Sequence, residues 1–211
     1  MNIHAILIPL ILLLLSCQQK VHEKQENKFS PFIEKANKKR ENKFSSFVEK
    51  FMSKELPYSF DEEYMRNLDE TTLLSIDTIL VGLFIEKNKT FAGGVKLHDM
   101  CRYLPLYRFS ISEGIQAVVF KQICGAGGVD DLYYLITYTD TGDELSRLLL
   151  SMEVGDCGNL EIKTGNISQT MEIETCSKVF ENDCGEENEY ILQNTTVEKF
   201  RITEKGKIVK R

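Results

Sequence analysis

From residue 102 onward, apolar residues recur at every second position, and short turn sequences separate the runs. Such alternation is typical of strands with one buried face, and Leu132, Tyr134, Ile136 and Tyr138 show it most clearly. Connections of a few residues between neighbouring strands require antiparallel pairing. The pattern therefore predicts a mainly β (α+β) fold whose single domain is an antiparallel meander, with strands at 103–111, 115–124, 131–139, 144–154, 167–180, 188–202 and 207–210.

The segment that precedes the predicted sheet contains an internal repeat. The sequence ENKFSPFIEK at 26–35 returns as ENKFSSFVEK at 41–50. Apolar residues of the second copy have helical spacing, and we expect Leu56-Pro57 to end this helix. The stripe consists of Phe44, Phe47, Val48, Phe51 and Met52.

Two interpretations of the repeat follow. The first copy carries Phe29, Phe32 and Ile33 at the same spacing, and Ser30-Pro31 offers a helix start. If both copies form one amphipathic helix, its apolar face would lie on lipid or on a partner protein. Alternatively, the second copy packs on the sheet as core and the first belongs to a loose stalk. We favour the second interpretation.

Residues 69–86 are ambiguous between helix and strand. Asp69 or Ser75 can cap a helix at this place in the sequence. The β-branched residues and Gly82 lower the helix propensity of the same segment. The sequence therefore leaves its structure open.

The first sixteen residues predict an export signal that is removed after Ser16. Residues 5–15 (AILIPLILLLL) are apolar, but this run is well short of the roughly 20 residues that a membrane-spanning helix needs. Leu14-Leu15-Ser16-Cys17 resembles a lipobox, in which the cysteine thiol receives a diacylglycerol. We expect lipidation at Cys17, and two or more acyl chains such as palmitate give firm membrane attachment. The lack of Lys or Arg in residues 1–4 departs from the usual signal.

Charge divides the exported chain into a basic tether and an acidic domain. Residues 18–54 contain ten Lys and Arg against five Asp and Glu, a net charge of +5. Residues 55–211 contain 16 against 27, a net charge of −11. A basic segment is attracted to anionic lipid, whereas an acidic domain is repelled by nucleic acid. We expect a signal peptide at 1–16, a basic tether with the duplicated helical segment at 17–54, a single domain at 55–211, and no nucleic-acid partner.

Five cysteines remain once Cys17 is lipidated: Cys101, Cys124, Cys157, Cys176 and Cys184. An exported chain meets oxidising conditions, so disulfides are expected, and the odd count leaves at least one thiol over. A hairpin that turns at 112–114 places Cys101 opposite Cys124. The meander also brings Cys157 to that end of the sheet, so Cys124 has two possible partners. Cys176 and Cys184 would close a short loop and offer a second bridge.

Several of these residues resemble a group of small lipoproteins of Gram-negative envelopes. The resemblance rests on the lipobox, on the phenylalanines at 44, 47 and 51 that lead to Leu56-Pro57-Tyr58, and on Tyr134 to Tyr138 (YLITY) before the turn at 140–142. The sequence FRI at 200–202, followed by GKI at 206–208, completes it. The resemblance covers most of residues 44–211. It implies an envelope location and a similar fold, and it implies no activity.

Few residues of the domain suggest chemistry. His98 is its single histidine, so a Ser-His-Asp or Cys-His site would depend on it. His98 and Cys101 have a zinc-ligand spacing, but no second short-spaced pair accompanies them. Gly125–Gly128 lacks the Gly-Lys-Ser/Thr ending of a phosphate loop. The acidic runs at 130–131, 140–144 and 181–189 lack the alternating pattern of a calcium loop. We predict no catalytic residue, metal site or cofactor.

These patterns predict a lipid-anchored envelope lipoprotein whose acidic domain is a non-enzymatic binding or structural module. Its expected contacts are the membrane, through the N-terminal lipid, and a protein partner in the envelope. Gln18 follows Cys17 in place of the Asp associated with inner-membrane retention, which favours the outer membrane. One alternative is an inhibitor or immunity-type lipoprotein that masks a basic enzyme such as a cell-wall hydrolase, with the net charge steering association. A hydrolase that uses dispersed carboxylates is another.

Overall fold

The computed structural model describes residues 35–36, 38–87, 100–124, 129–156, 158–182 and 190–211. The chain divides into two compact units, Met1–Asn42 and Lys43–Arg211, which are described separately. In the first unit, residues 35–36 and 38–42 are helical and exposed. Among the described residues of both units, no helix has the length and apolar character needed to cross a bilayer.

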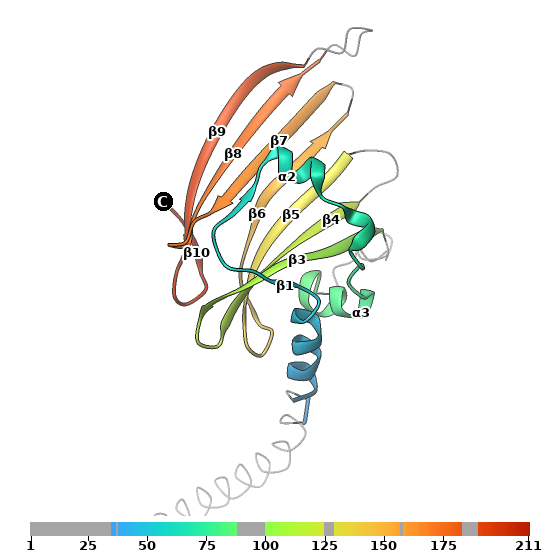
Figure 1. The fold of residues 1–211 in the computed structure, drawn as a ribbon, viewed down its shortest axis with the longest axis vertical. Coiled ribbons are helices and arrows are strands. Elements are labelled where there is room, and N and C mark those ends of the chain that lie inside the picture. Colours follow the sequence, from blue (N-terminus) through green and yellow to red (C-terminus); the bar gives the residue numbers. More distant parts are fainter. Residues whose placement is uncertain (1–34, 37, 88–99, 125–128, 157, 183–189) are drawn as a thin grey trace, which may run out of the picture. The chain divides into compact units, whose positions relative to one another are not determined.

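An antiparallel meander dominates the second unit (Figure 1). Each of its main strands pairs with the next along the chain, and β1 at one edge runs parallel to β3. The single, mainly β antiparallel sheet predicted from the alternation is confirmed. In chain order, the strands are β1 (Met52–Ser53), β2 (Tyr58–Phe60), β3 (Cys101–Ser112), β4 (Ile115–Cys124), β5 (Val129–Thr139), β6 (Glu144–Gly155), β7 (Asn159–Ile167), β8 (Glu172–Glu181), β9 (Ile191–Ile202) and β10 (Ile208–Lys210).

Two strands meet in the region predicted as one strand at 167–180. Strand β7 ends at Ile167, β8 begins at Glu172, and residues 168–171 turn between them. The N–H of Met171, whose φ is 61°, donates to the Ser168 carbonyl over 3.0 Å. The prediction is wrong here because the turn sequence Ser-Gln-Thr-Met has none of the glycine, proline or asparagine signals that usually mark turns.

Strand β7 changes partner half-way along. Its first half pairs with β6, and its second half pairs with β2. Strand β2 comes from a part of the chain about 100 residues earlier. At the crossing, a Cβ atom on Gly165 would lie 2.3 Å from the carbonyl oxygen of Leu150 in β6. Glycine is therefore required where β6 leaves β7 and β2 takes its place.

One side of strands β3–β5 packs against helical segments. The helical residues 43–48 place Phe44 with its ring centroid 5.3 Å from that of Tyr138, and Phe47 5.2 Å from Phe84. The second copy of the repeat is therefore core, as the favoured interpretation predicted: Phe44, Phe47, Val48 and Phe51 are each at most 3% exposed. Compact packing begins at Lys43, inside the segment predicted as tether.

The helical stripe does not extend to Met52. The helix ends at Val48, and Met52 is 63% exposed in β1, where it pairs with Tyr107 of β3. Pairing with β3 satisfies backbone groups that the edge of the sheet would otherwise leave open. The expectation that Leu56-Pro57 ends this helix is therefore wrong, because the chain has already become extended before it.

Short helical elements follow β2. Asp61, Asp69 and Asp77 each accept a hydrogen bond from a backbone N–H of the next turn, which begins three of these elements. The ambiguous region 69–86 thus contains separate helical turns, with Asp69 as one predicted cap and Asp77, in place of Ser75, as the other. The elements are α2 (Glu62–Asn67), η1 (Glu70–Thr72), α3 (Thr78–Leu80) and the π-helical η2 (Val81–Ile85).

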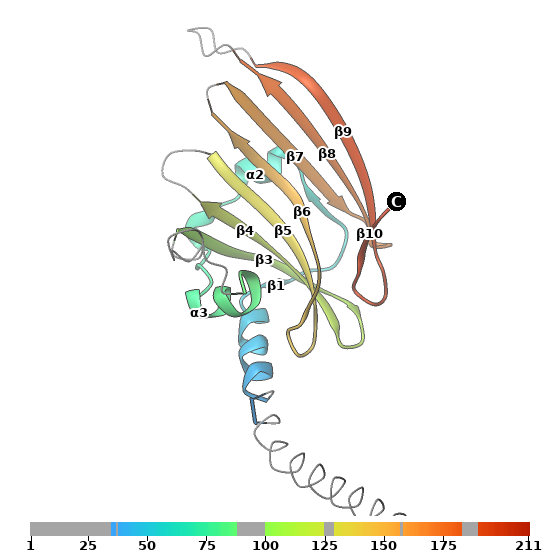
Figure 2. The same cartoon turned by 180° about the vertical axis from the view of Figure 1, so that it is seen from behind.

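The other side of the sheet packs against β2 and α2. These elements contribute Tyr58, Phe60 and Met65, which contact Tyr133 and Leu135 in a second core cluster. The covering segment lies in front of the sheet in Figure 1 and behind it in Figure 2. Strands β3–β5 are therefore buried on both faces. Within the covering segment, β2 lies next to β7 and pairs with it.

Candidate binding groove

A groove of about 570 Å³ lies where β2, β7, β8, β9 and the C-terminal residue meet. Its volume is within the range of about 300–1,000 Å³ typical of small-ligand sites. We call it the four-strand groove. Pro57, Ser59, Asn166, Ser168, Glu172, Glu174, Lys199 and Arg211 line it, together with the core residues Tyr58, Ile167, Ile173 and Phe200.

Sheet register arranges the polar side chains of the groove in a row. Ser59 pairs with Asn166, Asn166 with Glu174, and Glu174 with Lys199. Residues directly opposite one another in a sheet project from the same face. The four side chains, one from each strand, therefore form a continuous polar strip, and all four residues are exposed.

Two ion pairs stand on the wall of the groove. Lys199 Nζ lies 3.1 Å from Glu174 Oε2, and Arg211 Nη1 lies 2.6 Å from Glu172 Oε1. The Arg211 backbone N–H also donates to the Lys199 carbonyl over 2.9 Å, which fixes the last residue against β9. Solvent-exposed pairs of this kind contribute only about 0–1 kcal/mol each. A ligand with its own charges can therefore replace them at little cost.

Buried residues hold the groove in place. Tyr58, Ile167, Ile173 and Phe200 pair in sequence across the same four strands and belong to or pack against the second core cluster. Burial raises the pKa of Tyr58 to about 12, and nearby Tyr107 and Glu55 add to the rise. The Tyr58 hydroxyl is neutral at physiological pH and donates to the Lys54 carbonyl. The charged strip thus rests on a packed, preorganised layer.

A buried lysine is the second unusual polar feature. Lys121 of β4 is 1% exposed, and its ammonium group contacts Glu70 of η1 and Asp131 of β5. Burial alone would lower the pKa of Lys121, but the hydrogen bonds to the two carboxylates outweigh burial and raise it. Burial also raises the pKa of Tyr133 to about 12, against the opposing effect of Lys121. Because Lys121 has no open surface, it fastens η1 to the sheet rather than meeting a substrate.

A further charged cluster fastens the π-helical turn. Arg147 donates to the carbonyl of Ile85 and lies 3.2 Å from Glu144, and Lys87 lies 3.3 Å from the same carboxylate. Cations next to the last carbonyls of a helical segment stabilise it. Burial raises the pKa of Glu144, but Arg147 and Lys87 outweigh burial and hold it below its usual value. This cluster also has a structural role.

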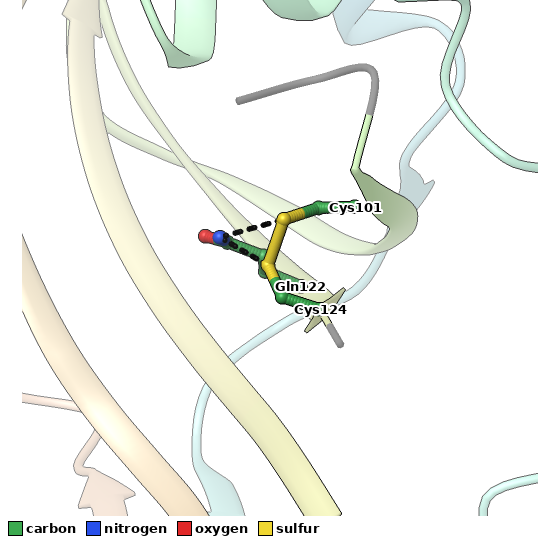
Figure 3. The surroundings of a disulfide bond; sticks show 3 residues. All are labelled: Cys101, Gln122 and Cys124. Carbon is green, nitrogen blue, oxygen red and sulfur yellow. Dashed lines mark hydrogen bonds between the residues drawn. A yellow bond between two sulfur atoms is a disulfide. The ribbon is translucent and has the colours of Figure 1, made fainter. Parts of the chain in front are cut away.

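The structure brings two of the predicted cysteines together. Cys101 and Cys124 form a disulfide between β3 and β4, and the Gln122 amide lies 2.9 Å from the Cys124 sulfur (Figure 3). Cys176 carries a free, half-buried thiol in β8. Beyond Cys176 the chain stays extended in β8 as far as Glu181. The second bridge that the sequence offers, from Cys176 to Cys184, is therefore not supported. Cys17, Cys157 and Cys184 lie outside the described residues, as do His98 and Gly125–Gly128.

The predicted acidic runs have separate surroundings. Asp131 pairs with Lys121, and Asp143 accepts a hydrogen bond from the Thr141 hydroxyl in the turn between β5 and β6. Most of the run at 181–189 lies outside the described residues. In the part of the chain that the structure describes, no three His, Cys, Asp or Glu residues cluster as metal ligands do.

Sequence reasoning missed the four-strand groove. Its residues range from Pro57 to Arg211 and meet only because β2 pairs with β7. Strand β2 has three residues, which are too few for alternating apolar and polar residues to reveal the pairing. The sequence signal that was present is a pair of acidic residues in β8, Glu172 and Glu174, followed by the basic residues Lys199 and Arg211. No protein family model, curated protein or solved structure matches this chain.

Proposed function

We propose that this protein is a lipid-anchored binding protein of the cell envelope, without catalytic activity, and that the four-strand groove is its ligand site. The lipobox-like sequence at 14–17 supports the anchor, with Cys17 as lipid acceptor and the outer membrane as location. The observation that carries the binding role is the groove itself. It combines a typical ligand-site volume with a polar strip drawn from four strands.

The charges of the groove favour a dipolar ligand. Two cations and two carboxylates form two ion pairs on its wall, so each charge is already neutralised by a neighbour. A ligand with one charge would leave one partner of a pair uncompensated. A ligand with both an amine and a carboxylate can satisfy both partners, and Ser59, Asn166 and Ser168 offer further hydrogen bonds. We propose short peptides with free termini as the ligand class.

The same pairing argues for binding in place of catalysis. A general acid or base must exchange a proton with its substrate near neutral pH. Glu172 and Glu174 are instead exposed, and each is engaged in an ion pair, with Arg211 and with Lys199. Recognition of charge is the role that this arrangement serves.

The anchor is tested by replacing its cysteine. We expect the wild-type chain to be recovered in the membrane fraction, to be solubilised from it by detergent, and to incorporate labelled palmitate. The Cys17→Ala variant should lose the label and leave the membrane fraction, with Cys176→Ala as the matched cysteine control. Undiminished labelling or membrane retention of Cys17→Ala would refute the anchor.

The groove is tested with a tripeptide of alanine that has free termini and with its acetylated, amidated analogue. Titration calorimetry of the full chain in detergent should detect binding of the free tripeptide and much weaker binding of the capped one. Replacing Lys199 and Glu174 by Gln should weaken binding about tenfold or more, because a hydrogen bond to a charged group contributes about 1.5–3 kcal/mol.

The matched control replaces Arg66 and Glu63, two exposed charged residues of α2 outside the groove, by Gln. This control should bind the free tripeptide as the wild type does. Equal binding of free and capped tripeptides, or full binding by the Lys199 and Glu174 variant, would exclude the proposed site.

A second candidate function is inhibition of a basic enzyme, such as a cell-wall hydrolase. Residues 55–77, which include β2, α2 and η1, contain seven acidic residues against one basic residue, Arg66. This segment lies across one face of the sheet (Figure 1). A surface with one sign of charge accelerates association with an oppositely charged protein. Inhibition that weakens with salt and with charge reversal of Glu62 and Glu63 would support it, and no inhibition of any cationic hydrolase in a panel would exclude it.

A further inference from the structure

A smaller pocket, of about 290 Å³, lies at the end of the sheet where the β3–β4 and β5–β6 hairpins turn. Both turns project at that end (Figure 1). The Asp140 N–H donates to the Gly114 carbonyl over 2.8 Å, which ties one turn to the other. We call this site the hairpin pocket, and it shares no residue with the four-strand groove. Its polar lining consists of Ser53, Arg108, Ser110, Ser112, Gln116 and Asp140.

Sheet register gathers part of this lining on one face. Arg108 and Ser110 lie two positions apart on β3, Ser53 of β1 pairs with Arg108, and Gln116 of β4 pairs with Ser110. Residues that pair across neighbouring strands, or that lie two apart on one strand, project from the same face of a sheet. Three strands therefore contribute four polar side chains to one wall of the hairpin pocket.

The charges of the hairpin pocket are not paired. Within the described ranges, neither the half-buried Arg108 guanidinium nor the exposed Asp140 carboxylate forms an ion pair or a hydrogen bond, although both line the pocket. The Gln116 amide and the Ser53 hydroxyl have no hydrogen-bond partner among the described residues either. In the four-strand groove, by contrast, both cations are paired. The hairpin pocket thus offers its polar groups to a ligand.

Most of the other polar groups in the pocket can only accept hydrogen bonds. The Ser110 hydroxyl donates to the Ser112 carbonyl over 3.3 Å, and the Ser112 hydroxyl donates to the Glu204 carbonyl over 2.8 Å. Each hydroxyl has one proton, so both serines are left with lone pairs for a ligand. The Asp140 carboxylate also only accepts. A matching ligand must therefore bring several donors in addition to an anionic group for Arg108.

A sugar acid has both of these features. We propose that the hairpin pocket binds a hexuronate unit, with the sugar carboxylate on Arg108 and ring hydroxyls on Asp140 and the serines. The planar guanidinium matches a carboxylate with two parallel hydrogen bonds. Hydroxyls around a ring donate from several points, whereas the ammonium of an amino acid donates from one. A neutral sugar would leave the guanidinium without a counter-charge. This site is separate from the proposed peptide site and does not depend on it.

The test is an NMR titration of the full, isotopically labelled chain in detergent, which follows the side-chain amide signals of Gln116. Glucuronate should shift these signals to saturation. Glucose, which has no carboxylate, should bind about tenfold or more weakly, because a charge-assisted hydrogen bond is lost. β-Alanine, which has a carboxylate and an ammonium group but no hydroxyls, should bind more weakly than glucuronate as well.

A substitution locates the carboxylate. Arg108→Gln should bind glucuronate and glucose equally, since the group that distinguishes the two sugars is gone. Arg102→Gln, at an exposed position of the same strand outside the pocket, is the matched control and should keep the wild-type preference for glucuronate. Equal binding of the two sugars to Arg108→Gln also shows that the variant is folded, because an unfolded chain would bind neither.

The comparison of ligands on the wild-type chain decides the proposal even if a variant fails to fold. No saturable shift with glucuronate, or equal affinity for glucuronate and glucose, would overturn it. Tighter binding of β-alanine than of glucuronate would assign the pocket to dipolar ligands instead, and a preference that persists in Arg108→Gln would place the carboxylate elsewhere. The peptide titration of the four-strand groove uses other residues and another ligand, so the failure of either site is distinguishable from the failure of the other.

Discussion

Cys101 lies directly opposite Cys124, with 4.3 Å between their Cα atoms, because strand β3 contains two bulges. At the turn, Ser112 pairs with Ile115, so an uninterrupted hairpin would place Tyr103 opposite Cys124. Register shifts between Ser110 and Ser112 and between Pro105 and Tyr107 each move the pairing by one residue. Proline has no N–H to donate to the ladder and is suited to the second bulge.

Removal of the disulfide should destabilise the domain without changing its fold. The bond joins residues 23 positions apart, and loop-closure entropy predicts a loss of about 3 kcal/mol. Urea denaturation of the Cys101→Ala, Cys124→Ala double variant should show this loss, with the far-ultraviolet circular dichroism unchanged. Reductant should lower the stability of the wild type to the same level and leave the double variant unaffected. Equal stability of oxidised and reduced wild type would contradict the assignment.

Gly165→Ala should disturb the point where β7 exchanges β6 for β2. The new Cβ would lie 2.3 Å from the Leu150 carbonyl oxygen, so the backbone of β6 must move. We expect a loss of about 3 kcal/mol, at the upper end of typical overpacking costs, seen as a lower urea midpoint. Because the clash is with a backbone atom, a second substitution, Leu150→Ala, should not restore stability. Wild-type stability of Gly165→Ala would show that the strands do not cross so closely.

Lys121 should be replaced at lower cost by methionine than by alanine. Removing one member of a buried ion pair costs about 3–5 kcal/mol when its partner becomes an uncompensated buried charge. The carboxylate side chains of Glu70 and Asp131 keep 33% and 26% exposure and can regain water, so we expect about half that loss for Lys121→Met. Lys121→Ala should lose more, because it also leaves a cavity. The ratio of the two losses, measured by urea denaturation, checks this; equal losses would mean that packing of the lysine stem contributes nothing.

The alternation of apolar residues was sufficient to predict the meander because it repeats over long strands. Strands β4, β5 and β6 were placed to within about two residues, since turns with Gly114 and Gly142 mark two of their ends. Strand β7 was missed for two physical reasons. Gly165 lowers its strand propensity, and the turn that ends it uses Met171 in a left-handed conformation, which no residue preference signals.

Prediction of the groove failed at β2. A strand of three residues is too short for alternation to be recognised, and the position of β2 depends on β6 leaving β7 at Gly165. The side chains of the groove come from residues more than 150 positions apart, and their proximity follows from this tertiary arrangement. The disulfide, by contrast, was among the predicted alternatives because Cys101 and Cys124 flank one hairpin.

Stability should depend on Glu144 in acid. Arg147 and Lys87 hold the pKa of this carboxyl below 4.5, its value in an unfolded chain, although burial acts in the opposite direction. A lowered pKa in the folded state means that the carboxylate contributes stability above pH 4.5, and that this contribution is lost as the pH falls through the folded-state pKa. Glu144→Gln should therefore be less stable than wild type by about 1 kcal/mol at pH 7, discounted for the exposure of Lys87. The difference should shrink as the pH falls below 4.5. Urea midpoints at a series of pH values measure it, with Glu113→Gln at an exposed turn as control. A difference between wild type and Glu144→Gln that stays constant through the acid range would show that the ion pairs with Arg147 and Lys87 do not stabilise the fold.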